Sequence, residues 1–204
     1  SRFLGLLRLL IQCFGLALRY CGAGLSKLYS ILGPKKGFRM CGIIGHFGQL
    51  AQLANVNGVQ SLLAHRGPDS SGSVLLDSNV YLGHTRLSIR DISSAGNQPM
   101  RSPDGKVCLV YNGEIYNCEE LKGGLASRGI SFASTCDTEV LVAGLMLEGA
   151  GFVERVKGDF ALAAYFFDSK ELVLIRDRFG VKPLYFFNDD SGFSFASEIK
   201  GLLP

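Results

Sequence analysis

A cysteine, an asparagine–glycine pair, an arginine and an aspartate are the residues of this chain whose types could act together on a small substrate. Cys41 follows Met40 and opens an apolar stretch, CGIIGHFG. If the bond to Met40 were cleaved, the free α-amine of Cys41 would have a pKa of about 7.7–8.0 and could accept the proton of its own thiol. The other interpretation is that Cys41 is a small core residue of a buried strand.

The pair Asn112–Gly113 lies in the stretch YNGEIYN. An Asn-Gly pair between apolar runs is a strong hairpin signal, and a tight turn is one interpretation. The other is an oxyanion site, in which the glycine lets a substrate approach the backbone N–H and the asparagine amide supplies a second donor.

Two further stretches carry charges that could hold an amino acid. Arg86 in GHTRLSIRD could clamp a carboxylate through two parallel hydrogen bonds, although a surface ion pair is the alternative. Asp137 and Glu139 in CDTEV could hold an ammonium, or could simply favour the start of a helix. A thiol, an oxyanion site, a carboxylate clamp and an ammonium anchor together predict a pocket for a free amino acid with a side-chain amide, which is glutamine.

Composition suits one globular domain with an appended segment. The chain has 204 residues, 47% of them hydrophobic, and 26 glycines. Residues 1–39 hold seven of the 21 Lys and Arg residues and none of the 18 Asp and Glu residues, so residues 40–204 carry 14 basic against 18 acidic side chains. This mildly acidic balance argues against a nucleic-acid partner.

Six cysteines are present, without a CxxC pair or a repeated spacing. The pattern therefore favours reduced thiols over a disulfide framework or a zinc site, and no metal is expected.

Residues 1–39 differ from the rest of the chain. The run Phe3–Leu18 is apolar except for Arg8 and Gln12. A transmembrane helix needs about 20 consecutive apolar residues, so this run is short for one and is interrupted by polar residues. Three interpretations remain: a membrane-surface helix, a removable pro-segment, or sequence upstream of the true start at Met40. We favour the last, with a domain over residues 40–204; if the extension is retained, a membrane-associated binding protein without catalysis is the competing hypothesis.

The pattern along the domain predicts short strands with helices between them. Strands are expected at residues 41–48 and 79–89, and helices at residues 55–64, 118–129 and 137–151. Residues 106–117 hold the Asn-Gly pair between two apolar runs. Two antiparallel hairpins are expected at residues 160–177 and 183–198. The fold class is α+β, with stacked sheets covered by helices.

The chain resembles the glutaminase domain of class II glutamine amidotransferases, which are N-terminal nucleophile hydrolases, and most closely the amino-terminal half of glutamine-hydrolysing asparagine synthetase. The matching stretches run in order through residues 40–204: MCGIIGHFG, HRGPDSSG, LGHTRLSI, AGNQPM, YNGEIYN, CDTEV, GDFALAAYFFD, RDRFGVKPLYF and FASEIKGLL. The resemblance implies a four-layer αββα sandwich.

The resemblance also implies a role for each site residue. Cys41 would attack the glutamine amide with its α-amine as proton shuttle, and Asn112 and Gly113 would hold the oxyanion. The stretch from Arg86 to Arg90 would bind the α-carboxylate side of glutamine, and Glu114 and Asp137 would bind the α-ammonium. Arg66 would help to order the loop over glutamine. The site residues expected from the stretch after Arg86 are Leu87, Ser88, Ile89 and Arg90.

The resemblance implies a cytoplasmic enzyme that hydrolyses glutamine to glutamate and ammonia. The ammonia would pass to an ATP-activated aspartate in a synthetase domain in cis, which would need ATP and Mg; this domain would need no cofactor, and a homodimer is compatible with it. The alternative acceptor belongs to a sugar or surface-polymer pathway. The synthetase motif SGGxDS is absent from these 204 residues. Arg90 and Cys118 stand where relatives usually carry other residue types.

Overall fold

The computed structural model describes residues 40–48, 60–88, 94–190 and 192–202. The expected extension over residues 1–39, the first half of the expected helix at residues 55–64, and the expected site residues Ile89 and Arg90 lie outside the described residues.

One antiparallel sheet has five strands in the order β2-β3-β1-β9-β8. Its central strand β1 starts directly after Cys41 and pairs with β3 from Gly42 opposite Thr85 to Phe47 opposite Val80. The start of β1 therefore lies beside the end of β3. The strands are β1 Gly42–Gly48, β2 Ser70–Leu76, β3 Val80–Arg86, β8 Tyr185–Asp189 and β9 Gly192–Ala196.

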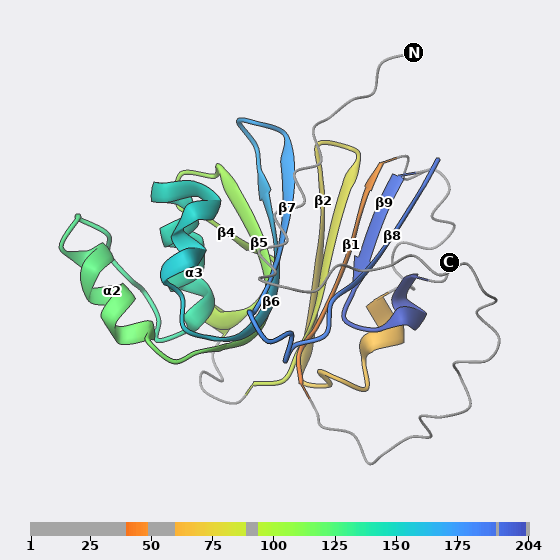
Figure 1. Ribbon diagram of the computed structural model, residues 1–204, viewed down its shortest axis with the longest axis horizontal. Helices are drawn as coiled ribbons and strands as arrows, with labels where there is room; N and C mark the ends of the chain where they lie inside the picture. The colour runs from red at the N-terminus through yellow and green to blue at the C-terminus, as the bar shows by residue number, and fades with distance from the viewer. Residues whose placement is uncertain (1–39, 49–59, 89–93, 191, 203–204) are drawn as a thin grey trace.

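The second antiparallel sheet has four strands in the order β4-β5-β6-β7. Its strands are β4 Met100–Arg101, β5 Val107–Ile115, β6 Gly158–Phe166 and β7 Glu171–Arg176. Two helices, α2 Cys118–Ala126 and α3 Asp137–Glu148, pack on the outer face of this sheet (Figure 1). Short 3-10 helices complete the described part: η3 Gln60–Leu63, η4 Ser94–Gly96, η5 Gly149–Arg155 and η6 Ile199–Leu202.

The layers follow from which side of each strand is apolar. In β1, Ile43 packs between the two sheets and its neighbour Ile44 packs on the outer face under Leu63 of η3, as the two-residue period of a strand requires. Both neighbours are buried, so both faces of the central strand are covered. From left to right, Figure 1 shows helices, the four-stranded sheet, the five-stranded sheet and the short helices η3 and η6. This arrangement is the expected four-layer sandwich.

Several predicted elements are confirmed. The two expected hairpins are β6–β7 and β8–β9, and α2 and α3 begin at the residues that the sequence predicts. The expected helix at residues 55–64 is represented in the described part only by the 3-10 helix η3. Within the described ranges, none of the helices has the length and hydropathy needed to cross a bilayer.

Candidate functional site

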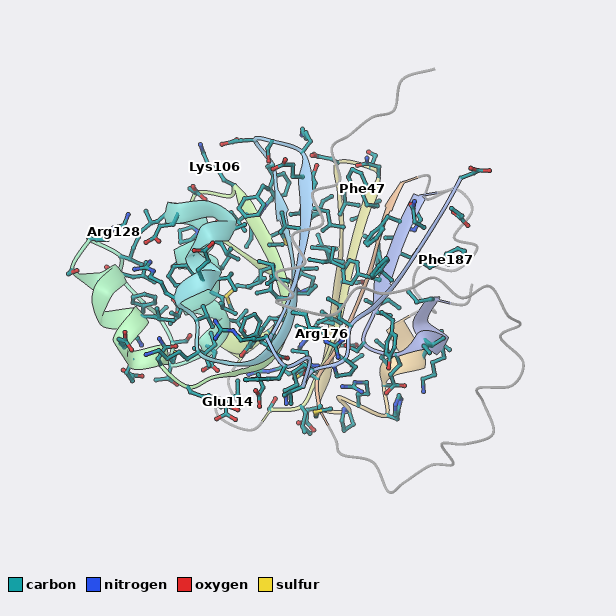
Figure 2. The ribbon with its side chains drawn as sticks, viewed as in Figure 1. Phe47, Lys106, Glu114, Arg128, Arg176 and Phe187 are labelled. Atoms are coloured by element: carbon teal, nitrogen blue, oxygen red, sulfur yellow. The ribbon has the colours of Figure 1, made fainter. Side chains whose placement is uncertain are left out.

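A cavity of about 210 Å³ opens at the end of the sandwich where β1 begins and β3 and β5 end. Glu114, on its wall, lies at the lower end of the molecule in Figure 2, opposite Phe47 and Lys106. The cavity brings together predicted residues from four separate elements. Its lining includes Cys41, Arg86, Leu87, Ser88, Asn112, Gly113, Glu114 and Asp137.

The thiol of Cys41 is held by the backbone of Leu87, the residue that follows β3. Leu87 N–H points at its Sγ at 3.4 Å, and the thiol contacts the Leu87 carbonyl oxygen at 3.6 Å. Burial raises the pKa of the Cys41 thiol, while the Leu87 N–H and the charges of Arg86 and Arg66 act in the opposite direction. Because burial is the larger effect, the thiol is protonated near neutral pH and needs a base to become a nucleophile.

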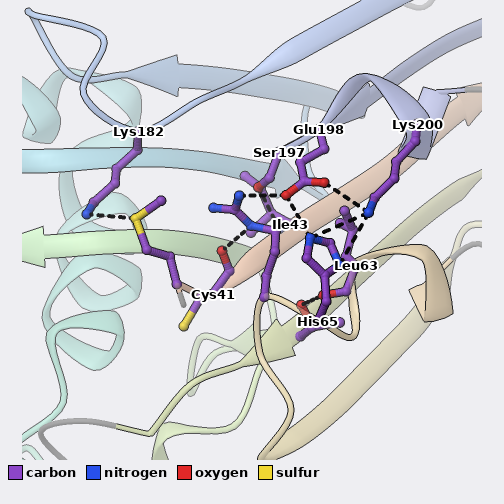
Figure 3. A network of polar contacts seen from close by, with 11 residues as sticks. Cys41, Ile43, Leu63, His65, Lys182, Ser197, Glu198 and Lys200 are labelled. Carbon is purple, nitrogen blue, oxygen red and sulfur yellow. Dashed lines mark hydrogen bonds and ion pairs between the residues drawn. The ribbon is translucent and has the colours of Figure 1, made fainter. Parts of the chain in front are cut away.

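The backbone of Cys41 is fixed from the other side by Arg66. Its Nε donates to the Cys41 carbonyl oxygen at 3.1 Å, and its Nη1 pairs with Glu198 at 2.9 Å. The same carboxylate contacts His65 at 3.0 Å and Lys200 at 3.2 Å. Figure 3 shows this network behind the nucleophile, on the side away from the thiol.

Strand β5 passes through Asn112 and Gly113 without turning, because Asn112 pairs with Ala161 and Gly113 with Phe160 of β6. The hairpin interpretation of the Asn-Gly pair is therefore wrong. Asn112 is buried, and its Nδ2 has no hydrogen-bond partner among the described residues. A Cβ at Gly113 would lie 2.5 Å from the Asp159 carbonyl oxygen, so the close pairing of β5 with β6 requires glycine. The uncommitted amide donor fits a site that receives an anionic oxygen from a ligand.

Arg86 ends β3 and is buried at the cavity wall, which argues against the surface ion-pair interpretation. Its Nη1 donates to Asn97 Oδ1 at 2.8 Å. Leu87 and Ser88 follow it along the wall, and the Ser88 N–H donates to Asp69 at 2.7 Å.

The two carboxylates at the start of α3 have different surroundings. Asp137 is buried on the cavity wall and accepts from the Ile115 N–H at 2.8 Å and from the Tyr111 hydroxyl at 3.4 Å. Glu139 instead accepts from the N–H groups of Ala133 and Ser134, at 2.7 and 2.8 Å. Of this pair, only Asp137 lines the cavity, and Glu139 holds the loop before the helix.

Several wall residues were not assigned a role from the sequence: Met40, Gly96, Gln98, Tyr111, Cys136, Thr138 and Lys182. Lys182 contacts Met40 Sδ at 3.5 Å (Figure 3). Gly96 and Gln98 belong to the stretch AGNQPM and Lys182 to RDRFGVKPLYF, so motif membership was the available signal.

The described cysteines Cys41, Cys108, Cys118 and Cys136 are free thiols. Cys118 is buried in the hydrophobic core that β5 forms with α2 and α3. In the described ranges, no group of three or more His, Cys, Asp or Glu residues is arranged to hold a metal ion.

A family model described as a glutamine amidotransferase domain matches residues 40–204. The chain belongs to this family. The match begins at Met40 and includes every element described above.

The domain is also similar to curated proteins of several kinds. It is 37% identical over 169 residues to an asparagine synthetase [glutamine-hydrolyzing] of Bacillus subtilis, covering 80% of this chain and 22% of that protein. It is 38% identical over 143 residues to the amidase chry2 of Gibberella zeae, covering 70% of this chain and 21% of that protein. The chain thus spans about a fifth of the length of these two relatives.

Two solved structures share the fold of the glutamine amidotransferase domain. One is the glutamine phosphoribosylpyrophosphate amidotransferase of B. subtilis, with a TM-score of 0.66, 23% identity, and coverage of 79% of this chain and 43% of that chain. The other, an allosteric regulatory enzyme of purine biosynthesis, has a TM-score of 0.67, 24% identity and the same coverage. Both support the expected four-layer sandwich as the fold.

Proposed function

We propose that this domain hydrolyses glutamine to glutamate and ammonia with Cys41 as the nucleophile. The observation that carries the proposal is the single cavity lined by the Cys41 thiol, the unpartnered Asn112 amide, Arg86 and Asp137. These groups supply a nucleophile, an oxyanion donor, a carboxylate partner and an ammonium partner, which are the four features that a glutamine amidase requires.

In the first half of the reaction, the Cys41 sulfur adds to the glutamine side-chain carbonyl carbon. Its proton passes to the α-amine of Cys41 and then to the departing nitrogen, which leaves as ammonia. Asn112 Nδ2 and the Gly113 N–H stabilise the negative oxygen that forms. The γ-glutamyl thioester is then hydrolysed by water, which releases glutamate and regenerates the thiol.

Arg86 and Asp137 hold the two ends of the amino-acid group. The Arg86 guanidinium binds the α-carboxylate, and Leu87 and Ser88 continue the same wall. We assign Ile89 and Arg90 to glutamine binding as well. Asp137 and Glu114 bind the α-ammonium. A ligand that lacks either charge would lose one of these two charge-assisted contacts, which accounts for selection of a free amino acid over an amide within a peptide.

This mechanism requires that the domain start at Cys41, with residues 1–39 and Met40 removed or never translated. In the structure Met40 lies on the cavity wall against Lys182, and a chain that keeps Met40 has no free Cys41 amine. The match of the family model from Met40 supports this start.

For the complete protein, we infer that the ammonia passes to an ATP-activated aspartate, with ATP and Mg bound by a synthetase domain in cis. The asparagine synthetases among the relatives support this acceptor. We place the reaction in the cytoplasm, where an unpaired thiol nucleophile stays reduced.

The test combines mass spectrometry with a glutaminase assay on natively expressed protein. The chain should start at Cys41 and release ammonia from glutamine, and Cys41→Ala should abolish the release with the fold intact. Cys108→Ala, which removes another buried thiol away from the cavity, serves as the matched control. A stable chain that keeps Met40 and hydrolyses glutamine, or full turnover by Cys41→Ala, would contradict the mechanism.

A further inference from the structure

The segment Gly96–Gln98 connects Arg86, which would bind the α-carboxylate of glutamine, to the start of α3, where Asp137 would bind the α-ammonium. It connects η4 to β4, and Gly96 and Gln98 both line the cavity. The proposed mechanism gives it no role, although Gly96 and Asn97 contact Arg86 and the Gln98 side chain contacts the backbone of β5 and the start of α3.

Gly96 and Asn97 fix the guanidinium of Arg86. A Cβ at Gly96 would lie 2.3 Å from Arg86 Nη2 and 2.9 Å from its Cζ, so the guanidinium packs directly on the Gly96 backbone. Asn97 Oδ1 accepts from Nη1 at 2.8 Å. Because Arg86 is buried, any residue larger than glycine at position 96 would displace the guanidinium or the segment itself.

Gln98 joins β5 to the start of α3. Its Oε1 accepts from the Tyr111 N–H at 2.6 Å, and its Nε2 donates to Thr138 Oγ1 at 3.1 Å. Strand β4 pairs with β5 only at Leu109 and Cys108. At Tyr111, beyond these pairs, the buried Gln98 side chain supplies the hydrogen-bond acceptor for the backbone N–H of β5.

Through these contacts the segment is connected to the oxyanion site and to the ammonium partner. Tyr111 precedes Asn112, and Thr138 follows Asp137. The segment therefore links the carboxylate partner Arg86 to the oxyanion donor and to the ammonium partner through contacts of at most 3.1 Å.

We propose that Gly96–Gln98 is a positioning segment that sets the distance between Arg86 and the oxyanion site, and thereby selects the length of the amino-acid substrate. This inference rests on the proposed glutaminase function. A side chain one methylene shorter than that of glutamine, as in asparagine, would not bring its amide to Cys41 while its carboxylate stays on Arg86. Misplacement by about 1 Å is enough to lower a rate about 100-fold.

Gly96→Ala tests the proposal in the mature protein that starts at Cys41. We expect the KM for glutamine to rise about 10-fold or more, because the displaced guanidinium loses its alignment with the α-carboxylate. Alkylation of Cys41 by iodoacetamide, which has no carboxylate, should keep its wild-type rate. The difference in KM between Gly96→Ala and wild type should also vanish for 4-aminobutanamide, the glutamine analogue without the α-carboxylate.

Gly123→Ala is the matched control, since a Cβ at Gly123 in α2 meets nothing within 4 Å. Asn97→Ala removes one hydrogen-bond partner of Arg86 at an exposed position, and should raise the KM by a smaller factor even if Gly96→Ala fails to fold. Wild-type protein that consumes no glutamine would contradict the proposed function itself. Active wild-type protein with both variants within twofold of the control in KM would overturn only the positioning role.

Discussion

At the scale of single residues, the decisive feature is how the structure holds a protonated thiol ready for activation. Burial raises the pKa of Cys41, and the Leu87 N–H and two arginines reduce but do not cancel that effect. A base close to the thiol is therefore required, and a free α-amine with a pKa of about 7.7–8.0 suits neutral pH. This is the physical reason for expecting the nucleophile at the start of a mature chain.

The second residue-scale feature is the support behind Cys41. Arg66 is buried and donates to the Cys41 carbonyl oxygen, while the partly exposed Glu198 holds Arg66 in that orientation. Without Glu198, the guanidinium would have a buried charge and no carboxylate partner. The position of the nucleophile thus depends on a residue far from it in sequence.

Glu198→Ala should lower the kcat for glutamine hydrolysis about 10- to 100-fold, because the Cys41 backbone loses its fixed orientation. The KM should change little, since Glu198 does not line the cavity. Steady-state kinetics of the variant would measure both constants. Glu198→Gln, which keeps an acceptor oxygen for Arg66, should recover part of the rate.

Glu120→Ala is the control for charge removal. Glu120 lies on the surface of α2, and its exposed carboxylate is 3.9 Å from the Lys157 Nζ. A Glu198→Ala enzyme with wild-type kcat would show that Arg66 holds Cys41 without help.

At the scale of elements, the connection between β7 and β8 is organised by one buried carboxylate. Asp177 Oδ1 accepts from the N–H groups of Phe179 and Val181, at 3.0 and 2.9 Å, and Oδ2 from that of Lys182 at 3.0 Å. Arg176 adds a hydrogen bond to the Lys182 carbonyl oxygen at 2.6 Å. These bonds fold residues 177–182 into a tight loop that places Lys182 on the cavity wall.

Asp177→Asn should lower the free energy of unfolding by about 3 kcal/mol, since an amide NH₂ would then face the backbone N–H groups that donate to Asp177, including the buried N–H of Phe160. Urea denaturation followed by far-UV circular dichroism would measure the loss. Asp168→Asn is the control, because Asp168 pairs with Lys106 at 2.8 Å at the surface with 72% of its side chain exposed, and should stay close to wild type. Equal stability of the two variants would mean that the loop is held by other contacts.

At the scale of the whole molecule, the two sheets are joined by packing and by a buried histidine. His84 of β3 hydrogen-bonds with the backbone of Tyr111 in β5 of the opposite sheet, and burial lowers the pKa of its imidazole to about 3. The folded protein therefore keeps His84 neutral, whereas the unfolded chain protonates it near pH 6.5. Between these two pH values the unfolded state binds the additional proton, so stability falls as the pH decreases.

His84→Asn should reduce this acid sensitivity. Between pH 7 and pH 5 the wild type should lose about 2 kcal/mol more unfolding free energy than the variant, as the pKa difference requires. Urea titrations at the two pH values would measure the loss for each protein. His65 lies on the surface, so His65→Asn should lose as much unfolding free energy between pH 7 and pH 5 as the wild type. An equal loss in all three proteins would contradict the assignment of the acid sensitivity to His84.

The sequence predicted much of the fold because its signals are local. The two hairpins and the starts of α2 and α3 follow from turn residues and from apolar alternation within ten or so positions. The Asn-Gly pair shows the limit of such signals, because a dipeptide typical of a turn lies here inside a straight strand. Pairing of β5 with β6 along its whole length outweighs the local preference.

By itself, the sequence determined which chemical groups are available: a thiol after Met40, an Asn-Gly pair, a strand-end arginine and an aspartate at a helix start. Only the tertiary structure decided that these groups share one cavity, that Glu139 points elsewhere, and that Arg66, Glu198 and the segment Gly96–Gln98 hold them in place. The reason is physical: residue type and short-range periodicity are written in the sequence. A contact such as that between Arg66 and Glu198, 132 positions apart, exists only once both sheets have packed.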